Sequence, residues 1–120
     1  MADRSVFRVR DVKQSILSIR QLLAGRSFES MYDDVVVRAA FERFLEILSE
    51  ASRSIPDEWK QKHGPAIPWR QVADLGNILR HAYHRTDAKM LWEVYLNDLT
   101  PLEAVIDDML AAHDRPNQSR

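Results

Sequence analysis

The stretch that decides the fold is VFRVRDVKQSILSIRQLL, residues 6–23. Apolar residues recur in it every three or four positions, at Val9, Val12, Ile16, Ile19 and Leu23. On a helix with 3.6 residues per turn, this spacing gathers them in one stripe and leaves the charged residues on the other faces. Gly25 follows and is a natural C-terminal stop. The stretch therefore predicts an amphipathic first helix.

The next segments show the same helical spacing. A second helix is predicted from about residue 30 to 52, with Asp33 and Asp34 in its early turns, where the helix dipole favours negative charge. Ile55-Pro56 ends it, a short helical turn is predicted over residues 57–62, and HGPAIP, residues 63–68, is predicted to be a loop. The predicted core positions of this second helix are Val37, Ala40, Phe41, Phe44, Leu45 and Leu48.

Further helices complete the chain. Pro68 can begin a third helix over residues 69–83, which buries Val72, Leu75 and Leu79. Thr86 or Asp87 is the predicted cap of a fourth. TPLE, residues 100–103, has the pattern of a capping box with proline at the first helical position, which predicts either a sharp kink or a fresh helix. The apolar positions expected in this last segment are Leu102, Val105, Ile106, Met109 and Leu110.

The fold class follows from these segments. Three glycines and five prolines in 120 residues leave little room for hairpins, and no stretch alternates apolar and polar residues for long. We predict an all-α, up-down antiparallel bundle of four to five helices. It is expected to form a single domain over residues 1–114, followed by a frayed polar tail over residues 115–120.

Composition and charge narrow the function. The chain has no cysteine, signal peptide or membrane span, and we expect it to be cytoplasmic. Its net charge of −1 excludes a non-specific nucleic-acid binder, because such a protein needs a broad basic face. Residues 1–26 hold six basic and two acidic residues, whereas residues 87–114 hold one basic and seven acidic residues. We expect the first and last helices to pair these charges.

The side chains best suited to catalysis lie in GNILRHAY, residues 76–83. Asn77 and His81 are four residues apart, so they share a helix face, and Arg80 lies next to His81. A histidine can transfer a proton near neutral pH, and a fixed guanidinium can hold a phosphate. Together they are the minimum set for cleaving RNA without a metal. His84, three residues after His81, is a possible accessory on the same face.

The segments NILRHAY (residues 77–83), LWEV (91–94) and NDL (97–99) resemble the HepT-like branch of the HEPN superfamily. The resemblance implies a small helical bundle that forms a homodimer and acts as a ribonuclease toxin. It also implies a partner, a minimal nucleotidyltransferase antitoxin that silences the toxin by adding AMP to a tyrosine. By this resemblance His81 matches the motif histidine, Tyr83 the modified tyrosine, and Asn77 a polar residue that often accompanies the motif. The expected partners are thus a second copy, the antitoxin and RNA, with no membrane.

One position departs from the pattern of that branch. Its motif has an arginine, then four to six residues, then the histidine. With four residues before His81, the arginine position is occupied by Gly76. With five or six, it is occupied by Leu75 or Asp74. Arg80 is the favoured substitute. Arg85 would be close if the helix continues past Tyr83. Arg70 lies eleven residues before His81, about 16 Å along a helix axis, which is too far.

The sequence is also compatible with two other functions. Because Gly76 replaces the motif arginine, the chain could be an inactive binding module that dimerises and holds a nucleotidyltransferase. It could also be a plain helical scaffold. No cofactor is predicted, and no metal site, because no carboxylate is placed to complete a set with the histidines His63, His81, His84 and His113. The tryptophans Trp59, Trp69 and Trp92 are expected to anchor the core or an interface.

Overall fold

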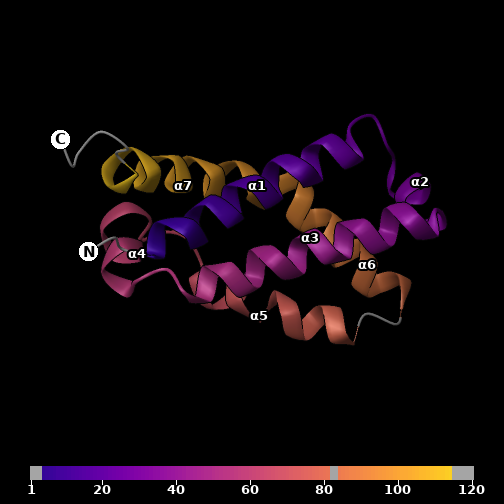
Figure 1. Ribbon diagram of the computed structural model, residues 1–120. Helices are drawn as coiled ribbons and strands as arrows, with labels where there is room; N and C mark the ends of the chain where they lie inside the picture. Colours follow the sequence, from indigo (N-terminus) through magenta and orange to yellow (C-terminus); the bar gives the residue numbers. More distant parts are fainter. Residues whose placement is uncertain (1–3, 82–83, 115–120) are drawn as a thin grey trace.

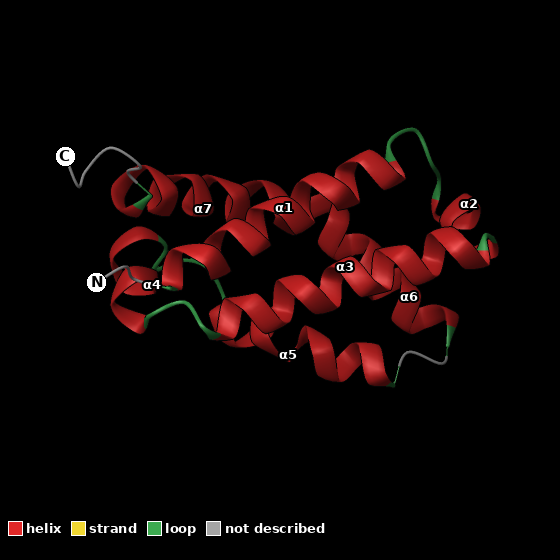
Figure 2. Cartoon of the chain, in the orientation of Figure 1, coloured by secondary structure: helices red, strands yellow, loops and turns green. Residues whose placement is uncertain are grey.

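The computed structural model describes residues 4–81 and 84–114, and in these residues every regular element is helical (Figures 1 and 2). The long elements run up and down beside one another, with α1 and α3 in the middle, α5 against α3 and α7 against α1. The prediction of an all-α antiparallel bundle is confirmed. The elements are α1 (Ser5–Leu23), α2 (Phe28–Asp33), α3 (Val35–Arg53), α4 (Asp57–His63), α5 (Trp69–Arg80), α6 (Arg85–Glu93), η1 (Val94–Asp98) and α7 (Leu99–His113).

The core is built from the apolar stripes that the sequence predicts. All five apolar positions of the α1 stripe are fully buried, so this helix is the centre of the bundle. Burying such side chains contributes about 1.5–3 kcal/mol each, which is the main term that holds the helices together. From α3 the core takes Val37, Phe41, Leu45 and Leu48, whereas Ala40 and Phe44 are only half-buried. From α7 it takes Leu102, Ile106 and Met109.

The single second helix predicted over residues 30–52 is wrong, because the chain breaks at Asp34. This residue leaves the helical conformation, with φ −93° and ψ 101°, and its carboxylate accepts hydrogen bonds from the backbone N–H groups of Val36 and Val37. Asp34 is therefore the N-cap of α3 rather than a residue in an early turn. The short helix α2 before it buries Phe28 and Met31.

The ends of α5 and α6 also differ from the prediction. Helix α5 ends at Arg80, not near Tyr83, and His81 is its C-cap. The N-cap of α6 is His84, so the prediction of Thr86 or Asp87 is wrong. The Asp87 carboxylate instead reaches back to accept a hydrogen bond from the His84 N–H, at 3.3 Å. Residues 82–83 lie outside the described residues, as does the predicted tail over residues 115–120.

The capping box predicted at the TPLE segment is wrong, because α7 already begins at Leu99, with Asp98 as its N-cap. Helix α6 passes into α7 through one wide turn, η1, in which the backbone forms π-type hydrogen bonds. Pro101 has no N–H, but it lies in the first turn of α7, where the backbone N–H groups have no intrahelical partner to lose. Thr100 lies inside this turn and is not an N-cap. Its hydroxyl instead accepts a hydrogen bond from Arg20 of α1, at 2.9 Å.

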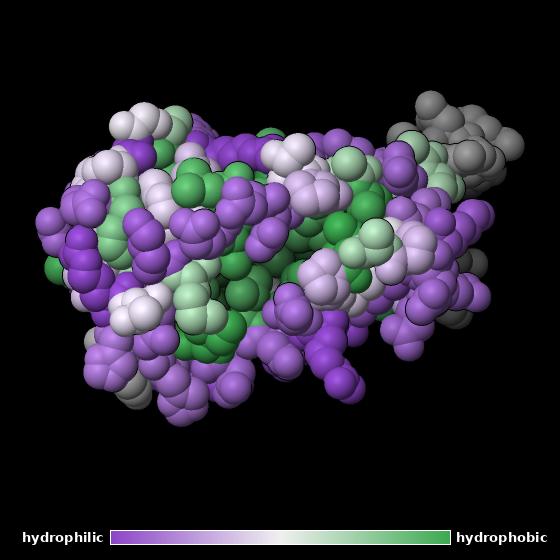
Figure 3. Space-filling model, turned by 180° about the vertical axis from the view of Figure 1, so that it is seen from behind, coloured by the Kyte–Doolittle hydropathy of each residue, from purple (hydrophilic) through white to green (hydrophobic). Residues whose placement is uncertain are grey.

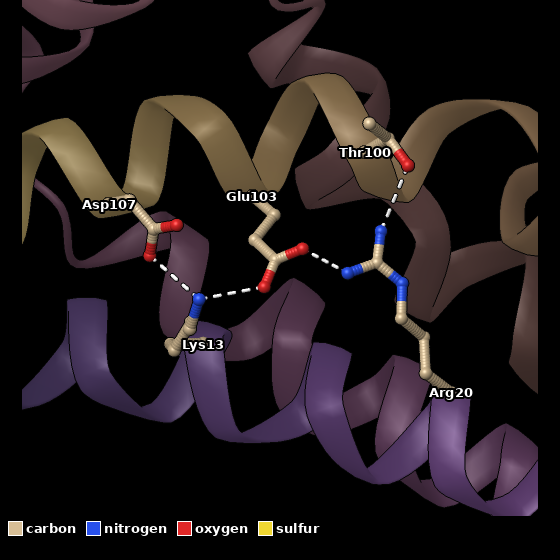
Figure 4. A network of polar contacts seen from close by, with 5 residues as sticks. All are labelled: Lys13, Arg20, Thr100, Glu103 and Asp107. Carbon is tan, nitrogen blue, oxygen red and sulfur yellow. Dashed lines mark hydrogen bonds and ion pairs between the residues drawn. The ribbon is translucent and has the colours of Figure 1, made fainter.

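Helices α1 and α7 are joined by a charge network, which confirms the expected pairing of the first and last helices (Figure 4). Lys13 Nζ lies 2.7 Å from Glu103 Oε2 and 2.8 Å from Asp107 Oδ1. Arg20 donates to the other Glu103 oxygen. The hydrogen bonds from Lys13 and Arg20 lower the pKa of the Glu103 carboxyl below its usual 4.5. This network fixes how α7 lies against α1.

Replacing Glu103 by glutamine is expected to lower the free energy of unfolding by about 1–2 kcal/mol at pH 7, because it removes two charge-assisted hydrogen bonds. Since folding lowers the pKa of Glu103, its contribution is complete above the unfolded pKa and disappears as the pH falls through the folded value. Urea unfolding should therefore show a larger difference between the two proteins at pH 7 than at pH 3. The matched control is Asp108→Asn, an exposed carboxylate of α7, and a loss as large as that of Glu103→Gln would contradict the assignment.

Two glycines should respond in opposite ways to alanine. A Cβ on Gly64, at the end of α4, would lie 2.6 Å from Val105 Cγ1, whereas a Cβ on Gly76 of α5 would meet nothing closer than 3.7 Å. We expect Gly64→Ala to destabilise the fold by about 1–3 kcal/mol through overpacking. Gly76→Ala should be neutral or stabilising by up to about 1 kcal/mol, because alanine favours a helix interior. Chemical unfolding of both variants measures this, and equal losses would contradict the close approach of α4 to α7.

Candidate functional site

The predicted catalytic residues lie at the C-terminal end of α5. Asn77, Arg80 and His81 are all exposed to solvent there. The His81 N–H still bonds to the Ile78 carbonyl at 3.1 Å, but its backbone, with φ −123° and ψ 20°, has left the helix. The helix end therefore places the imidazole at the surface, where a substrate can reach it.

The other predicted site residues are arranged differently from the expectation. His84 does not share a helix face with His81, because α5 has ended and His84 begins α6. Arg85 turns toward α2: its guanidinium lies 4.9 Å from the Phe28 ring centre and 3.3 Å from a Glu29 oxygen. The condition for Arg85 to assist His81, a helix that continues past residue 83, is not met. Tyr83 lies outside the described residues.

Gly76 is the point where α3 and α5 approach each other. The hydroxyl of Ser49 on α3 accepts a hydrogen bond from the Gly76 N–H at 3.2 Å and donates one to the Ala73 carbonyl at 2.9 Å. Both Ser49 and Gly76 are buried. Gly76, which occupies the position of the motif arginine, thus takes part in a polar contact between α3 and α5.

Two arginines direct their guanidinium groups toward Gly76. Nη1 of Arg80 lies 3.7 Å, and Nη2 of Arg53 lies 4.0 Å, from the point that a Cβ at position 76 would occupy. Arg80 reaches this point because helical side chains lean toward the N-terminus, onto the residue four positions earlier. Arg53 comes from the last turn of α3, and its Nε and Nη2 atoms donate to the Ala73 carbonyl at 3.2 and 2.8 Å.

Arg53 is a candidate site residue that the sequence does not suggest. It precedes Gly76 by 23 positions on another helix, so motif spacing along α5 gives no reason to consider it. Both arginines are exposed, and two fixed cations beside each other are repelled unless an anion lies between them. Guanidinium groups bind phosphate oxygens in a forked geometry. The pair therefore forms a candidate phosphate site next to His81.

A separate apolar groove runs along another face of α5, away from the Arg53–Arg80 pair. It has a volume of about 500 Å³ and lies between α5, α6, η1 and the start of α7. The view from behind shows a hollow with hydrophobic side chains in the middle of that face (Figure 3). Asn77 lines the groove, together with Val72, Leu75, Ile78, Met90, Val94 and Leu102. Asn77 therefore joins the groove to the end of α5 where Arg80 and His81 lie.

Two further features concern the described part of the chain only. Over residues 4–81 and 84–114, no three residues of the types His, Cys, Asp or Glu are grouped closely enough to hold a metal ion. Within the same residues, no helix combines the length and the apolar character needed to cross a bilayer.

Comparison with known proteins points to one family. The sequence model described as "Ribonuclease HepT-like" matches residues 12–109. The chain is 35% identical over 86 residues to a protein of Caldanaerobacter subterraneus named "Putative RNase TTE0752", covering 72% of this chain and 76% of that protein. It is 33% identical over 101 residues to the "Probable ribonuclease HepT" of Thermococcus cleftensis, covering 84% and 91% of the two chains.

A more distant relative, "Putative RNase MJ1380" of Methanocaldococcus jannaschii, is 28% identical over 97 residues and covers 81% of this chain and 88% of its own. No solved structure matches the chain. The family match spans the bundle from the middle of α1 to Met109 in α7, including the His81 region. On this match, the chain belongs to the ribonuclease HepT-like family.

Proposed function

We propose that this protein is an endoribonuclease that cleaves RNA through His81, Arg80 and Arg53 without a metal. The observation that carries the proposal is the convergence of the Arg53 and Arg80 guanidinium groups on Gly76, at the helix end that presents His81. Although Gly76 cannot supply the motif cation, two other side chains deliver guanidinium groups to the same point. The family membership and the names of the relatives support the same activity.

The proposed reaction uses the nucleophile that RNA itself carries. The 2′-hydroxyl attacks the adjacent phosphorus, and the bond from phosphorus to the 5′-oxygen breaks, leaving a 2′,3′-cyclic phosphate and a 5′-hydroxyl. His81 takes the proton from the 2′-oxygen or gives one to the leaving 5′-oxygen. Arg53 and Arg80 neutralise the charge that builds up on the phosphorane oxygens. Asn77 donates a hydrogen bond to a phosphate oxygen or orients the imidazole.

The proposal includes a homodimer. Two copies related by a two-fold axis would bring two His81 side chains to one substrate, so that one acts as base and the other as acid. The apolar groove beside Asn77 supports the homodimer. Met90, which lines this groove, is 51% exposed in the single chain, and burying its side chain against a second copy would be favourable. A second copy seated over the groove would lie next to both Asn77 side chains.

The proposal also includes a toxin–antitoxin pairing. A minimal nucleotidyltransferase would silence the protein by transferring AMP to the Tyr83 hydroxyl, with release of pyrophosphate. The added phosphate would be an anion close to Arg80, and it would compete with RNA for that cation. Expression of the chain alone should arrest growth. Co-expression with a neighbouring nucleotidyltransferase gene should restore growth and add whole AMP units to the intact mass, and these units should be absent from Tyr83→Phe.

The experiment that separates an active nuclease from an inactive binding module is Gly76→Arg. A Cβ at position 76 would be in ordinary van der Waals contact, so alanine fits there, and the longer arginine side chain would have to extend past Ser49 and Arg80. If Arg53 and Arg80 already supply the charge, a third guanidinium should change the rate of RNA cleavage by no more than about threefold. Gly76→Ala is the matched control for the loss of glycine itself. If the natural chain is inactive and Gly76→Arg raises RNA cleavage by about 100-fold or more, the natural chain is instead the inactive binding module.

A further inference from the structure

Two histidines that are distant in sequence meet at the end of the molecule where α4 lies beside the last turn of α7 (Figure 1). His63 is the last residue of α4, and His113 is the last residue of α7. Their Nε2 atoms are 3.4 Å apart, and the two rings are nearly perpendicular, with centres separated by 5.4 Å. They are 50 positions apart along the chain, so their contact arises only from the fold.

The distance between the two Nε2 atoms suits a shared metal ion better than a direct hydrogen bond. An N–H donor normally lies about 2.7–3.2 Å from its acceptor, so 3.4 Å is long for one ring donating to the other. Zinc binds histidine nitrogen at about 2.0–2.1 Å, and at a tetrahedral angle this places two ligand nitrogens about 3.3–3.4 Å apart. The spacing in this protein matches that separation.

Both rings are held in place by packing. The His113 ring stacks on the indole of Trp59, with ring centres 3.7 Å apart and planes within 3° of parallel, and Trp59 is only 7% exposed. The residue after His63, Gly64, lies so close to α7 that a Cβ added there would be 2.6 Å from Val105 Cγ1. The Gly64 carbonyl also accepts a hydrogen bond from Trp69 Nε1 at 2.8 Å. A metal would therefore find two ligands whose positions are already fixed, which lowers the entropic cost of binding.

We propose that His63 and His113 form a binding site for a divalent transition metal such as zinc, nickel or copper, which joins α4 to the end of α7. Two imidazole nitrogens select these ions over magnesium and calcium, which prefer oxygen ligands. Water completes the coordination shell, since the carboxylate of Asp114, the residue after His113, accepts from Arg10 instead. The site is at the opposite end of α5 from His81 and does not rest on the proposed ribonuclease activity.

Thermal unfolding of the full chain tests the site. After treatment with EDTA, saturating zinc or nickel should raise Tm by about 3–6 °C, and magnesium should leave it unchanged. The shift should disappear in His63→Gln and in His113→Gln, and it should persist in His84→Gln, the matched control at the other end of the molecule. Calorimetric titration with zinc should give one ion per chain for the natural protein and no binding for the His63 variant.

Several results would overturn the site. One is an equal zinc-induced shift in the natural protein and in His63→Gln. Another is a shift that His84→Gln abolishes, because the ion would then sit near α6. Should the glutamine variants be less stable in EDTA, Cu²⁺ quenching of Trp59 fluorescence provides a second readout, since the metal would lie beside the ring that stacks on this indole. Quenching that is unchanged in His63→Gln would equally refute the proposal.

Discussion

Replacing His81 by alanine is expected to lower the rate of RNA cleavage by about 10²–10⁴-fold, the usual contribution of one positioned proton-transfer group. The imidazole is exposed at the end of α5, so its removal leaves no cavity and should leave the stability of the bundle within about 0.5 kcal/mol. Single-turnover cleavage of a short unstructured RNA, with unfolding monitored in parallel, measures both effects. Growth arrest on expression should be lost as well.

His63→Ala is the control for removing a histidine, because that residue lies at the far end of the molecule on α4. Full cleavage by the His81→Ala variant would remove the ribonuclease assignment.

A mixture of two inactive variants, His81→Ala and Arg80→Gln, also tests whether the site is shared between two subunits. If each site combines His81 of one subunit with Arg80 of the other, random exchange should restore about a quarter of the natural activity. No recovery would mean either that both groups of a site lie in one subunit or that each site needs the His81 side chains of both subunits.

The features of the fold that follow from local periodicity could be predicted from the sequence. The α1 stripe, the core positions of α3 and the charge pairing between α1 and α7 depend on residue spacing and on complementary charge, and both can be read along the chain. The break at Asp34 could also have been found. An aspartate directly before Val35-Val36-Val37 is a typical N-cap, although the apolar spacing alone predicts a continuous helix through it.

The features that depend on tertiary contact could not be predicted in the same way. Whether the last helix begins at the TPLE segment or before it depends on the packing of α7 against α1, because Arg20 and Lys13 hold Thr100 and Glu103 in register. The approach of Arg53 to Gly76 likewise depends on how closely α3 packs against α5. A search for the missing cation along α5 alone considers only arginines such as Arg80 and cannot reach a side chain on α3.

Replacing Arg80 or Arg53 by glutamine is expected to lower the kcat/KM of RNA cleavage by about 10²-fold in each case, because each would remove one donor to the phosphorane oxygens. The double variant should lose more than either single variant but less than the product of the two, since both arginines act on the same phosphate. Arg70→Gln provides the control. This arginine is exposed in the first turn of α5, and its loss should change kcat/KM by less than about threefold.

Arg53 also donates to the Ala73 carbonyl, so its loss could act by shifting α5 rather than by removing charge. The salt dependence of cleavage separates these causes. Each lost phosphate contact should reduce the slope of log kcat/KM against log salt concentration by about 0.7, the value for single strands. A variant that only displaces the helix would keep the natural slope. Arg53→Lys should restore the salt slope but only part of the rate, because lysine keeps the charge and loses the fork. If Arg53→Gln keeps the full slope, Arg80 alone holds the phosphate, and Arg53 serves only to join α3 to α5.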